Sequence, residues 1–323
     1  MKKIYKDFID MAQSIYGYEY IPLHRPIFKG NERQYLLDCI DSNFVSSVGE
    51  KVTEFEQKVA EFTGSNYAVA TVNGTAALHV AIQLAGVMPG DEVITQAVTF
   101  IATCNAITYT GAKPLFIDVD LDTMGLSPKA LQTFLEKNTE KKANGTFNRL
   151  SGKKVSACIP MHTFGFPCRI KEIAEICDEW GISLIEDTAE SLGSYVSEDH
   201  TGTFAQMSAL SFNGNKLITT GGGGMIITNS SELARKAKHI TTTSKIPHAY
   251  EFVHDEIGYN YRLPNLNAAL GCAQMERIDE FLSIKNKIAN QWEGFFKKSP
   301  INFFKALKGN KANNWLNAIV LES

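Results

Sequence analysis

From Asn66 onward, the sequence alternates between short apolar runs and longer segments in which apolar residues recur at helical spacing. Such alternation is typical of parallel strands, because each parallel pair needs a crossover helix and these helices bury both faces of the sheet. We therefore predict an α/β fold with a mostly parallel central sheet and helices on both faces. The predicted strands lie near 67–72, 92–96, 114–118, 154–160, 182–186, 208–212 and 224–228. The predicted helices between them lie near 75–86, 100–110, 128–137, 170–180 and 231–239.

Helical spacing also marks the regions outside this alternation. Apolar residues recur three and four positions apart in three N-terminal segments, 4–16, 31–42 and 52–62. One long helical pattern begins near Pro264 and runs past Ile288. A strand-like run, 315–321, follows it, whereas the charged and aperiodic segment 138–153 is interpreted as a surface excursion. We expect three parts, namely an N-terminal helical extension (1–20), a large domain (21–263), and a bridging helix with the start of a small lobe (264–323).

The composition argues against several classes of partner. The 323 residues include 32 Lys and Arg against 35 Asp and Glu, which gives a formal charge of -3 and no basic surface for nucleic acid or membranes. No run reaches the roughly 20 apolar residues of a membrane helix, and the N-terminus lacks the apolar core of a signal peptide. The six cysteines show no Cys-x-x-Cys spacing, so we predict buried thiols, no metal site and a cytoplasmic protein.

Lys216 is the first candidate for chemistry. It follows the apolar run 209–212 and the small polar residues Asn213, Gly214 and Asn215. This pattern places the lysine on a turn at the edge of the sheet instead of on a solvated helix face. Lysine amines form Schiff bases with aldehydes, so a lysine in this position is a candidate nucleophile.

Three other motifs follow predicted strands at their C-terminal ends. Asn73-Gly74-Thr75-Ala76-Ala77 joins a strand to a helix, and the free N–H groups of Thr75, Ala76 and Ala77 are expected to attract an anion such as a phosphate. Asp187 directly follows an apolar strand, where ligands of open α/β sheets bind. Phe100 follows the strand near 92–96, where its ring faces a planar ligand or packs in the core.

These four features together meet the needs of pyridoxal phosphate (PLP). The cofactor requires an anion site, a face for its ring, an acid for its ring nitrogen and an amine for its aldehyde. A dinucleotide site is disfavoured, because no Gly-x-Gly-x-x-Gly follows the first strand.

Four motifs resemble those of the DegT/StrS-type nucleotide-sugar aminotransferases, which are fold-type I PLP enzymes. The motifs are 73–78 (NGTAAL), 186–194 (EDTAESLGS), 211–216 (SFNGNK) and 258–263 (GYNYRL). The resemblance covers residues 21 to about 290. It implies an enzyme that transfers an amino group, with glutamate as donor, to the 4-keto carbon of a nucleotide-linked deoxy sugar.

The resemblance also implies roles for individual residues. Lys216 binds the cofactor aldehyde as a Schiff base and then moves the proton, while Asp187 holds the ring nitrogen. Phe100 stacks on the ring, and the phosphate is held by Thr75, Ala76 and Ser211. Asn260 reaches the cofactor phosphate of a neighbouring subunit, which implies a homodimer with shared active sites and an interface loop at 241–263. Arg262 in the same motif and His162 at a strand end are the candidate substrate-binding residues.

Two residues depart from the commonest family pattern. Glu190 stands where many members carry His or Gln, and Asn213 stands where many carry His. Both are candidate cofactor-binding residues. A carboxylate beside the cofactor's phenolic oxygen requires a proton on one partner, so we expect a raised pKa for Glu190. The combination is most similar to enzymes that aminate UDP-linked 4-keto-6-deoxy-N-acetylhexosamines in legionaminic-type pathways.

The resemblance leaves alternatives open. Relatives continue beyond the position of Ser323 into a small domain, so we expect this chain to bind cofactor but to hold sugar poorly. A non-catalytic PLP-fold binding or regulatory protein is one alternative. The dehydratase branch of the same family is another, although its members have histidine in place of the lysine at 216.

Overall fold

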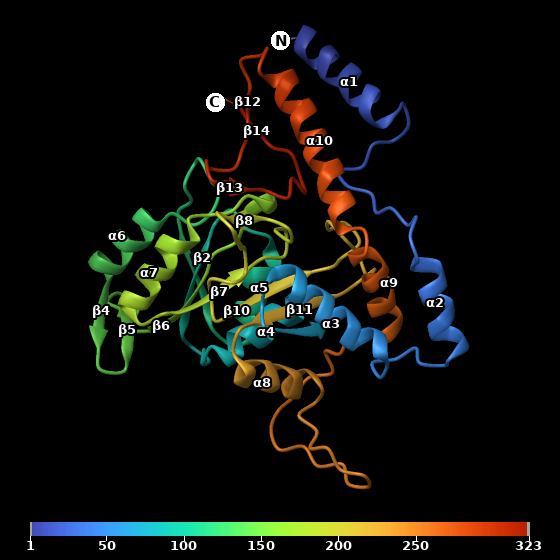
Figure 1. The fold of residues 1–323 in the computed structure, drawn as a ribbon. Coiled ribbons are helices and arrows are strands. Elements are labelled where there is room, and N and C mark those ends of the chain that lie inside the picture. The colour runs from blue at the N-terminus through green and yellow to red at the C-terminus, as the bar shows by residue number, and fades with distance from the viewer. Residues whose placement is uncertain (1, 322–323) are drawn as a thin grey trace.

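The computed structural model describes residues 2–321 and has a central sheet of mostly parallel strands (Figure 1). The main strands lie side by side in the order β1 (Tyr67–Thr71), β11 (Gly224–Thr228), β10 (Met207–Ser211), β7 (Ser183–Asp187), β6 (Lys154–Ile159), β2 (Glu92–Gln96) and β3 (Lys113–Ile117). The pairs from β10 to β3 are parallel, whereas β11 is antiparallel to both of its neighbours. All strands of this path except β11 therefore end at one edge of the sheet, which is where ligands of such folds bind.

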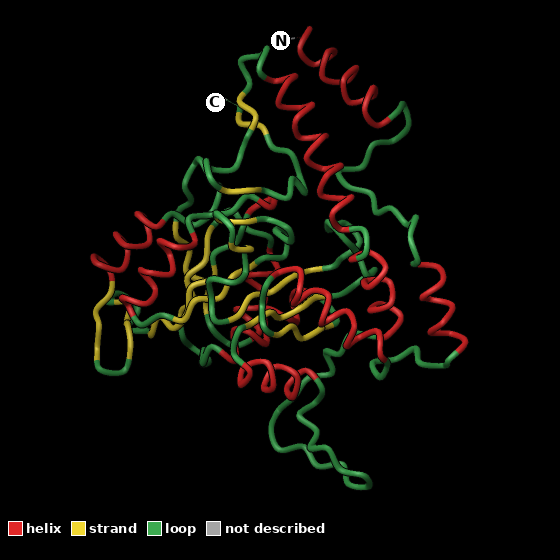
Figure 2. The backbone as a smooth tube through the Cα atoms, viewed as in Figure 1, coloured by secondary structure: helices red, strands yellow, loops and turns green. Residues whose placement is uncertain are grey.

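Helices cover both faces of the sheet, as predicted (Figure 2). The helices are α1 (Lys2–Tyr16), α2 (Glu32–Asp41), α3 (Glu50–Thr63), α4 (Gly74–Leu84), α5 (Ile101–Tyr109), α6 (Pro128–Asn138), α7 (Ile170–Trp180), α8 (Ser231–Thr241), α9 (Asn265–Met275) and α10 (Ile278–Phe296). A short 3-10 turn, η1 (Thr163–Gly165), follows β6.

The side chains of β11 explain why both faces are covered. Ile226 joins a buried cluster with residues of α4, α5 and α8, while its neighbours Met225 and Ile227 join a second cluster with residues of α3 and α9. Successive side chains of a strand point to opposite faces, so a strand with consecutive apolar side chains such as 225–227 requires a helix layer on each side. Every residue of β11 is buried accordingly.

The predicted long helix after Pro264 is wrong as a single element. The structure divides it into α9 and α10, because Arg277 has φ -117° and ψ 10°, which are not helical values. Glu276 at the end of α9 accepts hydrogen bonds from the Asn31 amide and the Tyr35 hydroxyl, at 2.8 and 2.6 Å. These contacts hold the end of α9 against α2, while α10 begins in a new direction (Figure 1).

Two expectations about strands also need correction. The segment 138–153 forms a hairpin of β4 (Thr139–Lys142) and β5 (Gly145–Asn148), and β5 pairs with β6 at the sheet. The run 315–321 contributes only β14 (Ile319–Val320), which pairs with β12 (Asn302–Phe303). A third small sheet is formed by β8 (Tyr195–Val196), β9 (Asp199–His200) and β13 (Asn310–Lys311).

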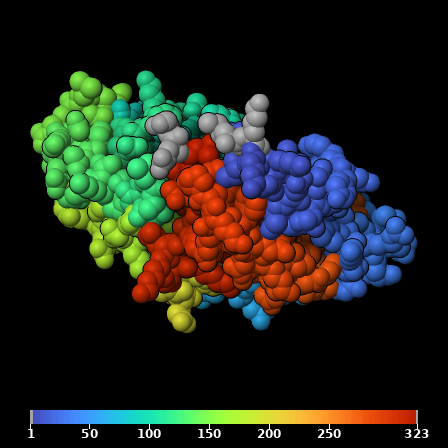
Figure 3. Space-filling model, turned by 90° about the horizontal axis from the view of Figure 1, so that it is seen from above, coloured from blue at the N-terminus to red at the C-terminus, as the bar shows by residue number. Residues whose placement is uncertain are grey.

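The N-terminal and C-terminal parts of the chain lie together beside the main sheet. The predicted amphipathic helix α1 packs on α10, where the rings of Phe8 and Trp292 stack with their centroids 5.0 Å apart. Figure 3 shows the N-terminal helix against α10 and the C-terminal segment on one face of the molecule. The division into three parts at residues 20 and 263 stays a prediction. Across residues 2–321, none of the helices has the length and apolar character that crossing a membrane requires.

Candidate active site

The adjacent parallel strands β7 and β10 place the predicted catalytic residues at one edge of the sheet. Asp187 is the last residue of β7, and Ser211 is the last residue of β10. The turn after β10 brings Lys216 back towards this edge, and its amide N–H donates to the Asn213 carbonyl at 3.0 Å. Below the turn, the buried Phe212 packs edge-on against Phe55 of α3, with ring centroids 4.9 Å apart. The apolar core therefore anchors the turn that carries the lysine.

The Lys216 amine lies between an acid and an aromatic ring. Its Nζ is 3.4 Å from Oε1 of Glu190 and 4.3 Å from the centroid of the Trp315 ring. The Lys216 and Glu190 side chains are largely buried, with 12% and 6% of their areas exposed. An ion pair in this setting is much less screened by water than one on the surface.

Asp187 is a buried carboxylate with few partners. It is 2% exposed, and it accepts hydrogen bonds from the Thr103 hydroxyl at 2.6 Å and from the Ala189 amide at 3.1 Å. Burial raises the pKa of Asp187, while the two hydrogen bonds and the nearby Lys216 charge act in the opposite direction. The charge of Lys216 therefore acts on the carboxyl group of Asp187.

Glu190 has the raised pKa that we predicted. Burial is the largest cause, and the charge of Lys216 and the amide of Phe164 partly offset it. The Phe164 N–H donates to Oε2 of Glu190 at 2.8 Å. Phe164 adopts φ 56° inside η1, a left-handed conformation that is uncommon for a residue with a side chain. Strained backbone of this kind is frequent at functional sites.

The predicted anion site at the start of α4 stays a prediction, and the structure shows that a cap already engages part of it. The amide of Ala76 donates to the Asn73 side chain at 2.8 Å, and the amide of Ala77 donates to the Asn73 carbonyl at 3.2 Å. These two groups are therefore not free, because Asn73 caps the helix. Among the predicted phosphate donors, Thr75 is the one whose amide this cap leaves available.

Close packing brings the start of α4 onto the ends of the strands. A Cβ atom added to Gly74 would lie 2.9 Å from the Ser211 Cβ, and one added to Gly224 would overlap the backbone of Asn73. Glycine at both positions lets the helix N-terminus approach Ser211 closely. Positive helix ends bind phosphate, so Thr75 and Ser211 fit the phosphate of the predicted cofactor.

Phe100 caps α5 just after β2, and 62% of its surface is exposed. β2 ends at the same edge of the sheet as β7 and β10, so the ring stands at the edge that also carries Asp187 and Lys216. Asn213 is exposed and donates to the Asn215 side chain at 3.1 Å, within the lysine turn.

His162 does not line a substrate pocket, so that assignment was wrong. Its side chain is completely buried, and Nε2 lies 2.9 Å from Oε2 of Glu186. Nδ1 accepts the Cys168 amide N–H, at 3.2 Å, so Nε2 carries the proton. Both ring nitrogens of His162 therefore form hydrogen bonds within the protein interior.

Asn260 and Arg262 interact with one another and with the end of β1. The Arg262 guanidinium donates to the Asn260 side chain at 3.1 and 3.0 Å, and Arg262 bridges to Thr71 at the end of β1. Arg262 also lines an open hollow of about 600 Å³ with Thr242, Lys245 and His248 of the protruding loop between α8 and α9. In the described part of the chain, no hydrogen bond or ion pair joins either residue to Lys216, Glu190 or Asp187.

Sequence reasoning missed three residues that contact the site. Thr103 holds Asp187, and Trp315 faces Lys216. The Asn313 side-chain amide donates to the carbonyls of Glu190 and Leu192, at 2.8 and 2.9 Å. Thr103 lies four residues after Thr99, about one helical turn, and this spacing is the one local pattern that indicates its position near the site. Asn313 and Trp315 are distant in sequence from their partners, so no local pattern indicates their contacts.

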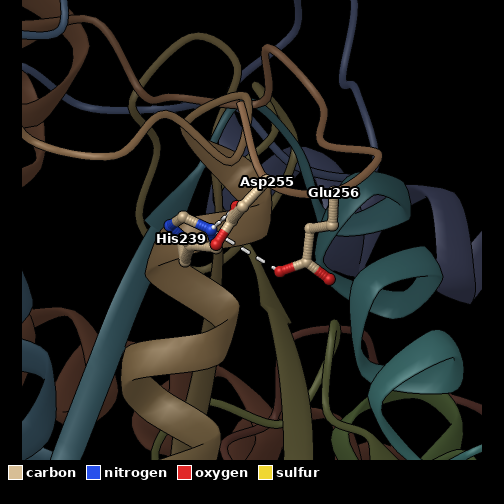
Figure 4. Close-up of side chains that lie close together, drawn as sticks. All are labelled: His239, Asp255 and Glu256. Carbon is tan, nitrogen blue, oxygen red and sulfur yellow. Dashed lines mark hydrogen bonds and ion pairs between the residues drawn. The ribbon is translucent and has the colours of Figure 1, made fainter. Parts of the chain in front are cut away.

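A second cluster of ionisable side chains lies on α8 and the loop that follows it (Figure 4). His239 Nε2 is 2.6 Å from Asp255 and 3.5 Å from Glu256, and Glu256 also pairs with Lys236 at 2.6 Å. These three side chains have the composition of a metal site. Their charges are already paired with one another and with Lys236, however, so the cluster ties the loop to α8.

Comparisons with known proteins identify relatives across nearly the whole chain. Residues 26–323 match the model of the DegT/DnrJ/EryC1/StrS aminotransferase family. The chain is 37% identical over 302 residues to GDP-perosamine synthase of Vibrio cholerae, covering 94% of this chain and 78% of that protein. It is 40% identical over 272 residues to GDP-perosamine synthase of Escherichia coli O157:H7, covering 84% and 70%. The solved PLP form of Spr1654 from Streptococcus pneumoniae has the same fold, with a TM-score of 0.83 and 22% identity over 94% of this chain and 79% of that one.

Proposed function

The chain belongs to the DegT/DnrJ/EryC1/StrS aminotransferase family, and from this premise we propose that it is a PLP-dependent aminotransferase acting on a nucleotide-linked keto sugar. The observation that carries the proposal is the meeting of Lys216, Asp187 and Glu190 at one sheet edge, beside the N-terminus of α4. An amine, a buried acid and an anion site are what PLP needs from a protein.

The proposed roles follow from the positions of these side chains. When bound, PLP supplies an aldehyde that binds amines and a ring that accepts electrons. The Nζ of Lys216 would hold the cofactor through its aldehyde, and the freed amine would accept and return a proton of the substrate carbon. The carboxylate of Asp187, held by Thr103, orients the ring through its nitrogen and favours the protonated ring.

The remaining residues position the cofactor. Thr75 at the start of α4 and Ser211 at the end of β10 would hold the phosphate, and the exposed ring of Phe100 would cover one face of the cofactor. Glu190, with its raised pKa, carries a proton towards the phenolic oxygen, and it lies within reach of the Lys216 amine. Asn213 completes the turn beside them.

The proposed substrates are glutamate as donor and a nucleotide-linked 4-keto-6-deoxy sugar as acceptor. The names of the two relatives with 37% and 40% identity favour a GDP-linked sugar. The motifs at Glu190 and Asn213 favour a UDP-linked 4-keto-6-deoxy-N-acetylhexosamine instead. The two alternatives differ in the base and in the group at C2, so a direct comparison of substrates separates them.

A spectroscopic half-reaction tests the function. The purified protein, converted to its pyridoxamine phosphate form, is mixed separately with GDP-linked and UDP-linked 4-keto sugars. We expect the absorption of the aldehyde form to return with one sugar class, and the Lys216→Ala variant to give no such return at a comparable rate. Lys141→Ala, which removes an exposed lysine on β4, is the matched control. Failure of every keto-sugar nucleotide to restore the absorption would contradict the proposal.

We further infer a homodimer in which the loop before α9 completes the partner's site. Among the described residues, no hydrogen bond or ion pair joins Asn260 or Arg262 to Lys216, which agrees with a role across an interface. Mixing inactive Lys216→Ala with inactive Asn260→Ala protein tests this. Shared sites would restore up to about one quarter of the wild-type activity by random subunit exchange, whereas independent sites would restore none.

A further inference from the structure

The C-terminal segment contributes an aromatic residue to the reactive lysine. Trp315 is only 5% exposed, and its ring face lies 4.3 Å from the Nζ of Lys216. An ammonium over the face of an indole is attracted by the negative potential of the ring, and the attraction strengthens when water is excluded. The same amine also lies 3.4 Å from Oε1 of Glu190.

Hydrogen bonds at three points fix the orientation of this ring. The indole N–H of Trp315 donates to the carbonyl of Asn215, the residue before the lysine, at 2.7 Å. The backbone amide of Trp315 donates to Asn313, which itself holds the carbonyl of Glu190. The carbonyl of Trp315 accepts the Nζ of Lys285 on α10, at 2.9 Å. The ring is thereby coupled to the lysine turn, to the Glu190 loop and to α10 at once.

Resting on the proposed function, we propose that Trp315 is a positioning residue that seats the free ε-ammonium of Lys216 beside Glu190. A transaminating lysine is released from the cofactor in each half-reaction and must then stay within reach of the reacting carbon. A flexible four-carbon side chain has many other rotamers. The ring of Trp315 restricts them, so that the amine remains between Glu190 and the sheet edge that carries Asp187.

The chain offers an internal control for this contact. Lys141 lies 4.5 Å from the centroid of the Trp180 ring, at nearly the same distance, but 47% of the Lys141 side chain is exposed. The same pair of residue types therefore occurs once at the proposed site and once at the surface of the hairpin. Variants of Trp180 therefore show the effect of losing a cation–π contact on a lysine that lies outside the proposed active site.

Trace labelling of the cofactor-free protein tests whether Trp315 positions the Lys216 amine, without relying on catalysis. Each lysine is acylated by a small amount of acetic anhydride, and the rates at Lys216 and Lys141 are each measured by peptide mass spectrometry relative to an added model amine. We expect Trp315→Leu to raise the Lys216 rate on the order of three- to tenfold, because the amine loses the ring that holds and shields it. Trp315→Phe retains a ring face, so its rate should lie within about twofold of wild type. Trp180→Leu should raise the rate at Lys141 and leave that at Lys216 unchanged.

Two outcomes would contradict the proposal that Trp315 positions the Lys216 amine. One is a Trp315→Leu protein that is folded by circular dichroism and labels Lys216 at the wild-type rate. If Trp315→Leu does not fold, the indole fluorescence of Lys216→Met is compared with that of the wild type, and an unchanged emission spectrum contradicts the contact. In the loaded enzyme, Trp315→Leu should lower kcat several-fold with KM nearly unchanged. Labelling tests the role of Trp315 separately from the proposed aminotransferase function. A protein that is inactive on all sugars can still show faster labelling of Lys216 in Trp315→Leu, and an active enzyme can show no such change.

Discussion

The two carboxylates at the end of β7 are neighbours in sequence and are both buried, but they differ in their hydrogen-bond partners. Glu186 is completely buried and accepts the amides of Gly202, Phe204 and Ala205, at 2.8 to 3.0 Å, as well as the proton of His162. The carboxylate of Asp187, on the opposite face of the strand, accepts hydrogen bonds from only the Thr103 hydroxyl and the Ala189 amide among residues 2–321. A buried acid whose oxygens are saturated by its own fold has no capacity left for a ligand. A buried acid with few partners and a raised pKa is a better candidate for function.

Asp187→Asn tests the functional side of this comparison and should have the largest effect. The amide keeps the shape of the side chain but carries no charge for the ring nitrogen. We expect amino transfer to fall by at least about a hundredfold, with thermal stability unchanged or slightly higher, because a buried carboxyl with a raised pKa is costly to ionise. Single-turnover absorbance and thermal unfolding measure the two quantities, with exposed Asp199→Asn as control. An active Asp187→Asn enzyme would contradict the assignment of Asp187 to function and of Glu186 to structure.

Glu186→Gln tests the structural side. The new amide group would face backbone N–H donors, which leaves several buried groups without acceptors. We expect a loss of about 3 to 5 kcal/mol in the free energy of unfolding, the range for breaking a buried charged network. Activity per folded molecule should stay within about threefold of wild type. Urea unfolding measures the first and active-site titration the second. A stable but inactive variant would show that Glu186 also serves the reaction.

Thr103→Val sharpens the comparison by removing one partner of Asp187. The substitution keeps the β-branched shape but deletes the hydroxyl that donates at 2.6 Å. A hydrogen bond to a charged group contributes roughly 1.5 to 3 kcal/mol, so we expect activity to fall about tenfold or somewhat more. Thr103→Ser, which restores the donor, should recover most of it. Equal activity of the Val and Ser variants would mean that the hydroxyl does not orient the carboxylate.

Glu190→Gln gives the smallest effect, and it appears in the pH dependence. Because burial raises the pKa of Glu190 in the folded state, the folded protein binds this proton more tightly than the unfolded chain does. Its contribution to stability is therefore present at low pH and is lost as the pH rises from about 4.5 through the folded-state value. We expect Glu190→Gln to flatten this decline in urea unfolding measured at successive pH values. An unchanged slope, together with an unchanged pH–rate profile, would argue against the raised pKa.

The features that the sequence predicted well are those encoded locally. The strands, their common edge and the positions of Asp187 and Lys216 follow from apolar runs and the turns directly after them. The start of α4 was also recognisable, although Asn73 was not identified as the cap that engages the amide of Ala76. Capping depends on a single rotamer, which a pattern of residue types does not specify.

The features that the sequence did not predict depend on partners far along the chain. His162 was expected in a pocket because polar residues at strand ends often bind ligands, but Glu186 and Cys168 enclose it. The break at Arg277 results from packing of α9 against α2, and helical spacing alone continues through it. The hairpin at 139–148 had a usable signal in Asn144-Gly145, a pair typical of tight turns.

The contacts of Asn313 and Trp315 have a consequence for how the protein is made. Their partners at Glu190, Leu192 and Asn215 precede them by 123, 121 and 100 residues. Translation therefore delivers the lysine long before the residues that enclose it. While a ribosome is adding the residues between Lys216 and Trp315, the nascent chain already carries the lysine but no indole beside that amine. A polypeptide released before Trp315 is synthesised would carry the reactive group without its surroundings.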